Sequence, residues 1–544
     1  MNVAEAVGRT LADLGVDHVF GVVGSGNFHV TNAMVAAGSR FVATRHEGGA
    51  ATMADAYARL SGTLAAVTVH QGCGLTNAMT GLAEASKSRT PLLVLTAEVA
   101  EKTSNFYVDQ EALVSSVGVV PRRVSSASTA VEETCAAVRT ALHERRTVLL
   151  SIPLHLQALE VPDGQPASPP ATPLPVVPSD AEVASLAELL DRSERPVFVA
   201  GRGARGPGCR EALEALADRC GALVATSAVA KGLFNRNPWS LDVSVGFSSP
   251  LAAELISGAD LIVGWGCALN MWTMRHGRLI STDASVAQVD DDHAALGLHR
   301  DIHLGVTGDV LTTARLALEA AGPERQGYRS TGLRDRIAAQ IRWRDVPFED
   351  TSTADRIDPR TLSIMLDDIL PRERVLAVDS GNFMGYPSMF LSVPDELGFC
   401  FTQAFQSIGL GLATGVGAAL TQPDRLPVAA LGDGGALMSA VELDTVRRLG
   451  LPMVVVVYND DAYGAEVHHF RPDGYPVDTV TFPSTDIAAI ARGYGFETVT
   501  VRSADDLKVV GDWVSGDRSA PLLIDAKVVD DHAAWWLEEA FRGH

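Results

Sequence analysis

Residues 426–466 read LPVAALGDGGALMSAVELDTVRRLGLPMVVVVYNDDAYGAE. The apolar runs 427–431 and 453–458 predict two buried strands, and residues 437–449 predict a helix that follows a glycine-rich turn. A strand, a helix and a strand in this order form a right-handed crossover that returns to the same edge of a parallel sheet. The stretch therefore predicts an α/β fold.

An aspartate follows each of these two strands. Asp433 stands in the turn Gly432-Asp433-Gly434-Gly435, and Asp460 follows it after 27 residues. Both are expected at the carboxyl edge of the sheet, where open α/β sheets bind ligands. Carboxylates together with phosphate oxygens suit Mg²⁺, and a helix N-terminus offers N–H groups to the phosphate. The alternative is that each aspartate only caps the element after it, but the second acid at this spacing favours the metal site.

Composition limits the class of protein. The 544 residues carry a net charge of −22, which argues against a nucleic-acid partner. No apolar stretch approaches the ~20 residues needed to span a bilayer, so no membrane partner is expected. The first residues lack a signal-peptide pattern, and the six cysteines form no C-x-x-C pair. These features predict a cytoplasmic protein.

Short apolar runs alternate with helical periodicity along most of the chain, which predicts three doubly wound parallel-sheet domains. Seven prolines in the eighteen positions 161–178 predict an extended linker. The expected domains cover residues 1–165, 179–340 and 358–544.

The Gly-Asp-Gly sequence and the Asn-Asp-Asp that follows it resemble the diphosphate–metal motif of thiamin-diphosphate-dependent enzymes, in which Asn-Asn stands at the second place. Asp460 replaces the second Asn, which keeps an oxygen ligand and adds a charge. The resemblance implies that Asp433, Asp460 and the backbone carbonyl of Ala462 bind Mg²⁺. It places Gly434 and Gly435 against the diphosphate.

A second motif lies in the first domain. Residues 43–62 read ATRHEGGAATMADAYARLSG, in which Glu47 opens a predicted helix. Alone, Glu47 is typical of an acid favoured by the helix dipole. The segment resembles the cofactor-activating helix of the same family, in its acetolactate synthase, benzoylformate decarboxylase and benzaldehyde lyase branch. The resemblance implies that Glu47 contacts the aminopyrimidine ring, and that the three domains bind the pyrimidine, form the centre and bind the diphosphate, in that order.

The resemblance also implies residues near the substrate. Ser25 and His70 follow predicted strands, where benzoylformate decarboxylase has a Ser and a His and acetolactate synthases have small residues. Gln110 falls where carboligating relatives such as benzaldehyde lyase place a glutamine. Glu466 matches by its offset the proton-relay glutamate of pyruvate decarboxylase. The alternatives are a structural strand-end histidine, a solvated loop amide and a solvent-facing helix acid.

Further cofactor contacts come from the same resemblance. Ile408 matches the bulky residue that bends the cofactor into its V shape, and Gly381 and Asn382 match a diphosphate contact. The remaining cofactor positions are Gln406, Gly432 and Tyr463.

The middle domain contains a glycine motif of another kind. Gly201, Gly203 and Gly206 form G-x-G-x-x-G after a predicted strand, but no acid ends the next strand over 222–226. A tight strand–helix turn is the better interpretation, and we expect no flavin here, although acetolactate synthases bind FAD in this domain. An NAD(P)- or FAD-dependent oxidoreductase using this loop is the alternative from another functional class.

The implied activity is decarboxylation of a 2-oxo acid with thiamin diphosphate and Mg²⁺, followed by carboligation of acyloin or acetolactate type to an acceptor carbonyl. The alternative is a decarboxylase that releases an aldehyde. Because the family brings Glu47 and Asp433 to one cofactor from two chains, we expect a homodimer or homotetramer with the active site at the subunit interface. The closing segment, with Trp535, Trp536 and Phe541, either covers the site entrance or is a docked surface helix.

Overall fold

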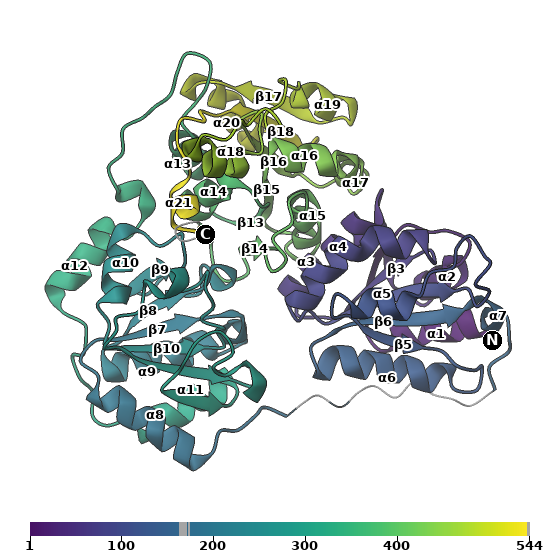
Figure 1. Cartoon of the computed structure of the whole chain (residues 1–544), viewed down its shortest axis with the longest axis horizontal. Coiled ribbons are helices and arrows are strands. Elements are labelled where there is room, and N and C mark those ends of the chain that lie inside the picture. Colours follow the sequence, from purple (N-terminus) through teal and green to yellow (C-terminus); the bar gives the residue numbers. More distant parts are fainter. Residues whose placement is uncertain (163–170, 172–173, 541–544) are drawn as a thin grey trace.

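The computed structural model describes residues 1–162, 171 and 174–540 (Figure 1). Three six-stranded sheets follow one another along the chain, and all paired strands are parallel. The prediction of three α/β units is confirmed. Most of the linker expected over 161–178 lies outside the described residues, as does Phe541.

The first unit contains a sheet with the order β2-β1-β3-β4-β6-β5. Its strands are β1 (His18–Gly21), β2 (Arg40–Ala43), β3 (Ala65–Val69), β4 (Leu92–Glu98), β5 (Val120–Arg123) and β6 (Thr147–Pro153). Its helices are α1 (Val3–Asp13), α2 (Phe28–Ala36), α3 (Glu47–Ser61), α4 (Cys73–Lys87), α5 (Gln110–Ser115), α6 (Ala130–His143) and α7 (Leu154–Gln157).

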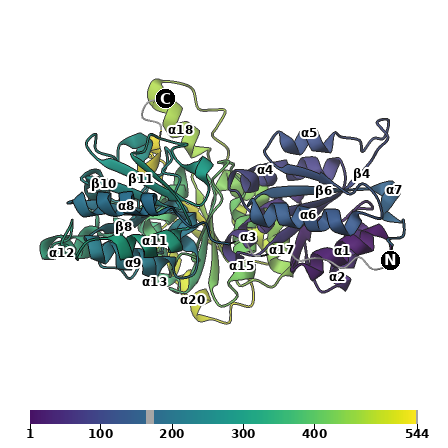
Figure 2. The same ribbon diagram turned by 90° about the horizontal axis from the view of Figure 1, so that it is seen from below.

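The second unit has the strand order β12-β11-β10-β7-β8-β9. Its strands are β7 (Pro196–Ala200), β8 (Leu223–Thr226), β9 (Ser240–Val243), β10 (Leu261–Trp265), β11 (Ser285–Asp290) and β12 (Leu304–Thr307). Its helices are α8 (Asp180–Arg192), α9 (Cys209–Cys220), α10 (Pro250–Ser257) and α11 (Val310–Ala320), and α12 (Thr331–Gln340) follows them. In both views this unit and the first unit lie on opposite sides of the molecule (Figure 2).

The third unit has the strand order β14-β13-β15-β16-β18-β17. Its strands are β13 (Arg374–Val378), β14 (Phe399–Phe401), β15 (Leu426–Gly432), β16 (Val454–Asn459), β17 (Glu497–Val501) and β18 (Leu522–Lys527). Its helices are α13 (Pro359–Ile369), α14 (Gly385–Phe390), α15 (Gly411–Thr421), α16 (Asp433–Ser439), α17 (Leu443–Arg448), α18 (Gly464–Phe470), α19 (Ile487–Gly493), α20 (Lys508–Ser515) and α21 (Trp535–Ala540).

The first and third sheets share one order, since β1 to β6 correspond in turn to β13 to β18. The two units pack through α3 and α15, which lie side by side (Figure 1). One apolar core runs through both units. A Cβ at Gly417 of α15 would lie 2.2 Å from the carbonyl oxygen of Met53 in α3, so only glycine permits this approach.

The crossover between Asp433 and Asp460 has the predicted topology, because β15 and β16 are parallel neighbours. The helix predicted over 437–449 is wrong in its start and its continuity. It begins at Asp433 and is interrupted by a 3₁₀ turn at Ala440–Glu442 before α17. Gly434 and Gly435 lie within the helix, and both must be glycine because side chains there would collide with Tyr463 and Asp379. In the part of the chain that the structure describes, no helix combines the length and apolar character needed to cross a bilayer.

Candidate active site

A cavity of about 1410 Å³ lies where the second and third units meet, next to the edge of the first. Twelve of the residues predicted from the sequence line it: Gly381, Asn382, Gln406, Ile408, Gly432, Asp433, Gly434, Gly435, Asp460, Ala462, Tyr463 and Glu466. They come from the carboxyl ends of β13, β15 and β16 and from the loop between β14 and α15. The structure therefore brings the predicted diphosphate and metal residues together.

The two carboxylates of the predicted metal site interact directly. Asp433 begins α16, and its carboxylate lies against that of Asp460, which follows β16. Burial raises the pKa of Asp433 to about 6. Burial and the neighbouring Asp433 raise the pKa of Asp460 well above the ordinary aspartate value. Two buried acids that resist joint ionisation fit a divalent cation, which would neutralise both.

Asp461, the residue after Asp460, does not join the carboxylate pair. Asp461 forms ion pairs with Arg356 at 2.6 Å and Lys527 at 3.7 Å. It is therefore held away from the carboxylate pair. A short antiparallel bridge uses the carbonyl of Asp461 and the N–H of Tyr463, and leaves the Ala462 carbonyl out of that pairing. This carbonyl can serve as a third oxygen ligand.

The two glycines after Asp433 are required by close packing within the protein. A Cβ at Gly434 would lie 2.5 Å from the ring of Tyr463, and one at Gly435 would lie 2.2 Å from Asp379 Oδ2. Among the described residues no cluster of three or more His, Cys, Asp or Glu side chains could hold a metal. A cation at Asp433 and Asp460 would thus depend on other oxygens, such as those of a diphosphate.

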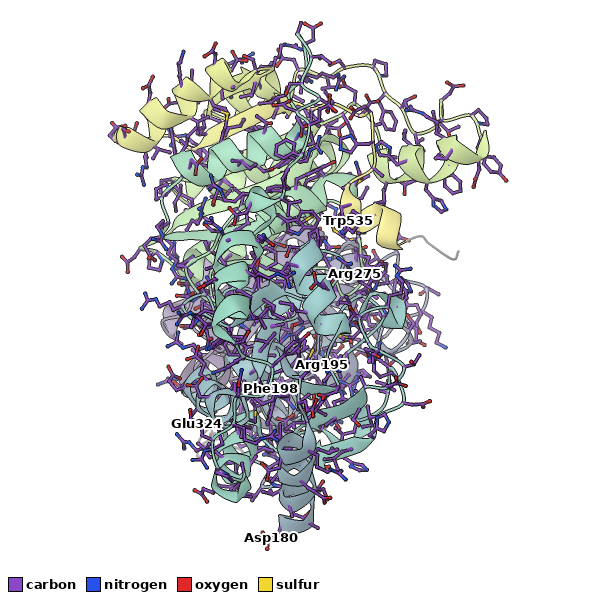
Figure 3. All side chains as sticks on the ribbon, turned by 90° about the vertical axis from the view of Figure 1, so that its left-hand side faces the viewer. Asp180, Arg195, Phe198, Arg275, Glu324 and Trp535 are labelled. Carbon is purple, nitrogen blue, oxygen red and sulfur yellow. The ribbon has the colours of Figure 1, made fainter. Side chains whose placement is uncertain are left out.

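The segment around Trp535 and Trp536 packs against the loop after β13, which carries Asn382. Asn382 Oδ1 accepts from the N–H of Ala534 at 2.9 Å, and its carbonyl accepts from Trp536 Nε1 at 2.8 Å. Trp536 lines the cavity, and the Trp535 ring lies 5.7 Å from the Arg275 guanidinium of the second unit (Figure 3). The sequence left open whether this segment covers the site entrance or is a docked surface helix. Its described part forms a wall of the cavity, which fits the first alternative.

Glu47, Ser25 and His70 form a second group on the first unit. Glu47 Oε2 accepts from Asn77 Nδ2 at 3.0 Å. His70 Nδ1 lies 2.9 Å from the carbonyl of Gln71, which assigns the proton to Nδ1 and leaves Nε2 to accept from Ser25 Oγ at 3.5 Å. A Cβ at Gly74 would lie within 3.3 Å of both Glu47 Oε1 and His70 Cβ, so these side chains are close neighbours.

Gln110 supports this group from behind. Its side chain is buried, and it accepts from the N–H of Gly72 at 3.3 Å and donates to the carbonyl of Ala97 at 3.1 Å. Both ends of the amide are thus used within the first unit. They hold the loop that carries His70, and a direct contact of Gln110 with the cofactor stays a prediction.

The two groups of predicted residues are separate within one chain. Glu47, Ser25, His70 and Gln110 are not among the residues that line the cavity with Asp433. A single chain therefore carries the predicted site residues in two separate groups, one on the first unit and one on the third, which we call the two half-sites.

Three family models match the chain in sequence. The N-terminal TPP binding domain of thiamine pyrophosphate enzymes matches residues 1–117, their central domain matches 183–316, and their C-terminal TPP binding domain matches 379–526. The chain belongs to the thiamine pyrophosphate enzyme family. Thiamine pyrophosphate is thiamin diphosphate, so the family prediction is confirmed.

Named relatives in this family catalyse different reactions. The probable 2-ketoarginine decarboxylase AruI of Pseudomonas aeruginosa is 30% identical over 93% of this chain and 91% of its own. The sulfoacetaldehyde acetyltransferase of Alcaligenes xylosoxydans xylosoxydans is 27% identical, over 93% and 89%. The putative acetolactate synthase large subunit IlvB2 of Mycobacterium tuberculosis is 28% identical, over 87% and 88%. The chain is thus a thiamin-diphosphate-dependent lyase or transferase.

The glycine motif of the second unit has a packing role. A Cβ at Gly201 would lie 2.2 Å from the carbonyl oxygen of Gly266, and one at Gly203 would lie 2.8 Å from Gly266 Cα. The loops after β7 and β10 touch only because these positions lack side chains. β8 ends at Thr226, so the acid of a dinucleotide site is missing there. The expectation of no flavin stays a prediction.

Sequence reasoning missed Asp379, which follows β13. Its buried carboxylate accepts from the N–H groups of Ser380 at 2.8 Å, Gly409 at 2.9 Å and Leu410 at 3.2 Å. Burial raises its pKa to about 6. Asp379 thereby fixes the residues just after Ile408. An acid directly after a buried strand was the available signal, and it is the signal that identified Asp433.

Binding of Mg²⁺ is expected to weaken as the pH falls through about 6, because protons and the cation compete for Asp433 and Asp460. The folded-state pKa of Asp433 is raised above 3.8, so the metal-free protein should lose stability as the pH rises from 3.8 to about 6. Added Mg²⁺ and thiamin diphosphate should therefore raise Tm more at about pH 7.5 than at about pH 5. An equal rise at both pH values would contradict this assignment.

Proposed function

We propose that this enzyme decarboxylates a 2-oxo acid with thiamin diphosphate and Mg²⁺ and joins the remaining acyl carbon to an acceptor carbonyl. The observation that carries the proposal is the cavity wall in which Asp433, Asp460 and the glycines of α16 converge. The cavity volume of about 1410 Å³ exceeds the roughly 300–1,000 Å³ of most small-molecule sites. That space suits a cofactor together with a donor and an acceptor.

The proposed roles divide between two units. Residues 1–165 would bind the pyrimidine and residues 358–544 the diphosphate. Asp433, Asp460 and the Ala462 carbonyl would hold Mg²⁺. When bound, thiamin diphosphate supplies a carbanion nucleophile and an electron sink.

The chain's own acid–base groups would move the protons. Glu47 would hold a proton at the aminopyrimidine ring. Ser25 Oγ donates toward His70 Nε2, so this pair can take up and return a proton at the substrate. Glu466 lines the cavity and can do the same. The 3.5 Å Ser25–His70 contact is also what favours the second candidate, a decarboxylase that releases an aldehyde.

The proposed enzyme is a homodimer, or a homotetramer built from such dimers, with the active site between chains. Apolar side chains remain exposed beside both half-sites. Leu437 and Met438, on the helix that Asp433 begins, are 42% and 54% exposed. Phe28 and Phe106, near Ser25 and His70, are 52% and 47% exposed. In the proposed dimer a second copy covers these residues, and Glu47 of one chain meets Asp433 of the other.

Asp460→Asn is expected to retain most activity, whereas Asp460→Ala is expected to lose roughly a hundredfold or more. Asparagine keeps an oxygen ligand and removes the repulsion with Asp433. Alanine removes the ligand. The measurement is the Mg²⁺ dependence of the rate for both variants, and equal losses would show that Asp460 does not bind the metal through its oxygen.

The function is tested by CO₂ release from a panel of 2-oxo acids with thiamin diphosphate and Mg²⁺, with and without acceptor aldehydes and ketones. Release that rises with an acceptor, together with a carboligated product, supports the proposal. Full release without an acceptor supports the second candidate. No release from any substrate, in a protein that binds the cofactor, refutes both and assigns the enzyme to other acyl donors.

A further inference from the structure

Glu442 of the third unit holds the turn that precedes Glu47 in the first unit. Its Oε1 accepts from the backbone N–H groups of Arg45 at 3.1 Å and His46 at 2.9 Å, and Oε2 accepts from Thr445 Oγ1 at 2.6 Å. The Glu442 side chain is buried, with 2% exposure. A Cβ at Gly49 would lie 2.5 Å from Oε1, so the carboxylate lies directly against the first turn of α3.

Glu84 of the first unit does the same for the third. It is fully buried on α4, and its two oxygens accept from the backbone N–H groups of Ala404 at 3.0 Å and Phe405 at 2.6 Å. Arg59 Nη2 donates to Oε1 at 2.7 Å, and Arg59 Nη1 donates to the carbonyl of Phe401 at 3.0 Å.

We call each of these carboxylates, together with the two backbone N–H groups that it binds, a clamp. Gln406, the residue after the Glu84 clamp, has a strained backbone. Gln406 has a φ of +60°, in the left-handed region that a non-glycine residue occupies only when its surroundings impose it. The N–H groups of the two preceding residues are both bound by Glu84. Gln406 and Ile408 line the cavity, so the clamp determines where this part of the wall lies.

The two clamps occupy equivalent places in the repeated fold. Glu84 lies on the helix after β3, and Glu442 lies in the 3₁₀ turn after α16, which follows the corresponding strand β15. Glu442 accepts hydrogen bonds from the connection between β2 and α3, and Glu84 accepts them from the corresponding connection between β14 and α15. Each carboxylate binds two consecutive N–H groups just before a predicted cofactor residue, Glu47 or Gln406.

We propose that Glu442 and Glu84 are positioning residues that act in opposite directions between the two units. Glu442 of the third unit fixes the turn before Glu47 in the first unit, and Glu84 of the first unit fixes the turn before Gln406 in the third. Their importance for the reaction rests on the proposed function, but the clamping itself does not. Within one chain the clamps would hold the Glu47 half-site and the Asp433 half-site in a fixed relation.

Glutamine distinguishes the two clamps. At position 442 both N–H groups make their shorter bonds to Oε1, and the Arg45 N–H reaches Oε2 only at 3.4 Å. A glutamine can therefore keep its oxygen at the Oε1 place and donate its NH₂ to Thr445 Oγ1. At position 84 both oxygens accept from N–H groups, those of Ala404, Phe405 and Arg59, so an NH₂ at either place meets another donor. Glu442→Gln should thus preserve its clamp, whereas Glu84→Gln should break its own.

The test measures amide hydrogen exchange in the full-length, cofactor-free protein, and deuterium exchange at the thiazolium carbon once thiamin diphosphate and Mg²⁺ are added. In Glu442→Ala the amides of residues 45 and 46 should exchange roughly tenfold faster or more, with a similar fall in the carbon exchange rate. In Glu442→Gln both should stay within about twofold of the unchanged protein. In Glu84→Gln the amides of residues 404 and 405 should exchange faster, and the Kd for thiamin diphosphate should rise about tenfold.

Asp444→Asn is the matched control, because Asp444 binds the side chains of Arg45 and Arg448 at the same junction without binding the backbone of Arg45, and an asparagine oxygen can still accept from both. It should change neither readout. The positioning role is overturned if Glu442→Gln behaves like Glu442→Ala, or if the amides of residues 45 and 46 are equally protected in Glu442→Ala. The comparison of Glu442→Gln with Glu442→Ala tests the positioning role of Glu442 even if Glu84→Gln fails to fold. If the unchanged protein neither binds thiamin diphosphate nor exchanges its carbon proton, the proposed function fails, and the amide exchange still decides the clamps.

Discussion

Replacing Glu47 by glutamine is expected to lower the rate of catalysis about 10²- to 10⁴-fold, the contribution typical of a positioned acid–base group. Glutamine has the same shape and can still accept from Asn77 Nδ2, which lies 3.0 Å from Glu47 Oε2. Folding and cofactor affinity should therefore change little. The measurements are kcat on the substrate found by CO₂ release, the deuterium exchange rate at the thiazolium carbon, and the Kd for thiamin diphosphate.

A suitable control is Glu132→Gln, since Glu132 is an exposed acid in the first turn of α6 of the same unit. It should leave all three quantities unchanged. Full activity of Glu47→Gln would contradict the assignment of Glu47.

A mixture of two inactive variants is expected to regain activity. Glu47→Gln and Asp433→Ala each disable one half-site, and homodimers of either should be nearly inactive. If Glu47 of one chain serves Asp433 of its partner, each heterodimer contains one intact site and one site with both changes. Random reassociation of equal amounts should then give about a quarter of the unchanged activity.

The experiment uses co-expression, or mixing under conditions that exchange subunits, followed by the CO₂ assay. Two Glu47→Gln preparations treated in the same way provide the background. If both residues of a site came from one chain, no heterodimer would contain an intact site and no activity would return. The recovered fraction thus distinguishes a site shared between chains from one contained within each chain.

Most of the fold was predictable from local patterns. Buried parallel strands are nearly continuous apolar runs, so strands such as β15 and β16 are visible in the sequence and their parallel pairing follows from the crossover length. The helix after Asp433 was harder, because two glycines resemble a turn. They are required by side chains that approach from elsewhere, Tyr463 and Asp379.

The candidate site was predictable only in part. An acid at the end of an apolar run identifies a position at the sheet edge, which is why Asp433 and Asp460 were found. Gln110 was predicted near the cofactor, with a solvated loop amide as the alternative. The structure shows its side chain buried and bound to Gly72 and Ala97, so the solvated alternative is wrong and the cofactor contact stays a prediction.

The three parallel sheets, the position of the carboxylate pair and the family could all be inferred from the sequence. Each of these depends on residues close in the chain, whose spacing fixes their relative placement. The residues that join the units could be found only in the folded protein. Glu442 and the turn it binds are 396 and 397 residues apart, and Glu84 and its partners are 320 and 321 apart. A carboxylate binds any two N–H groups that folding brings to it, so no local pattern marks its partner.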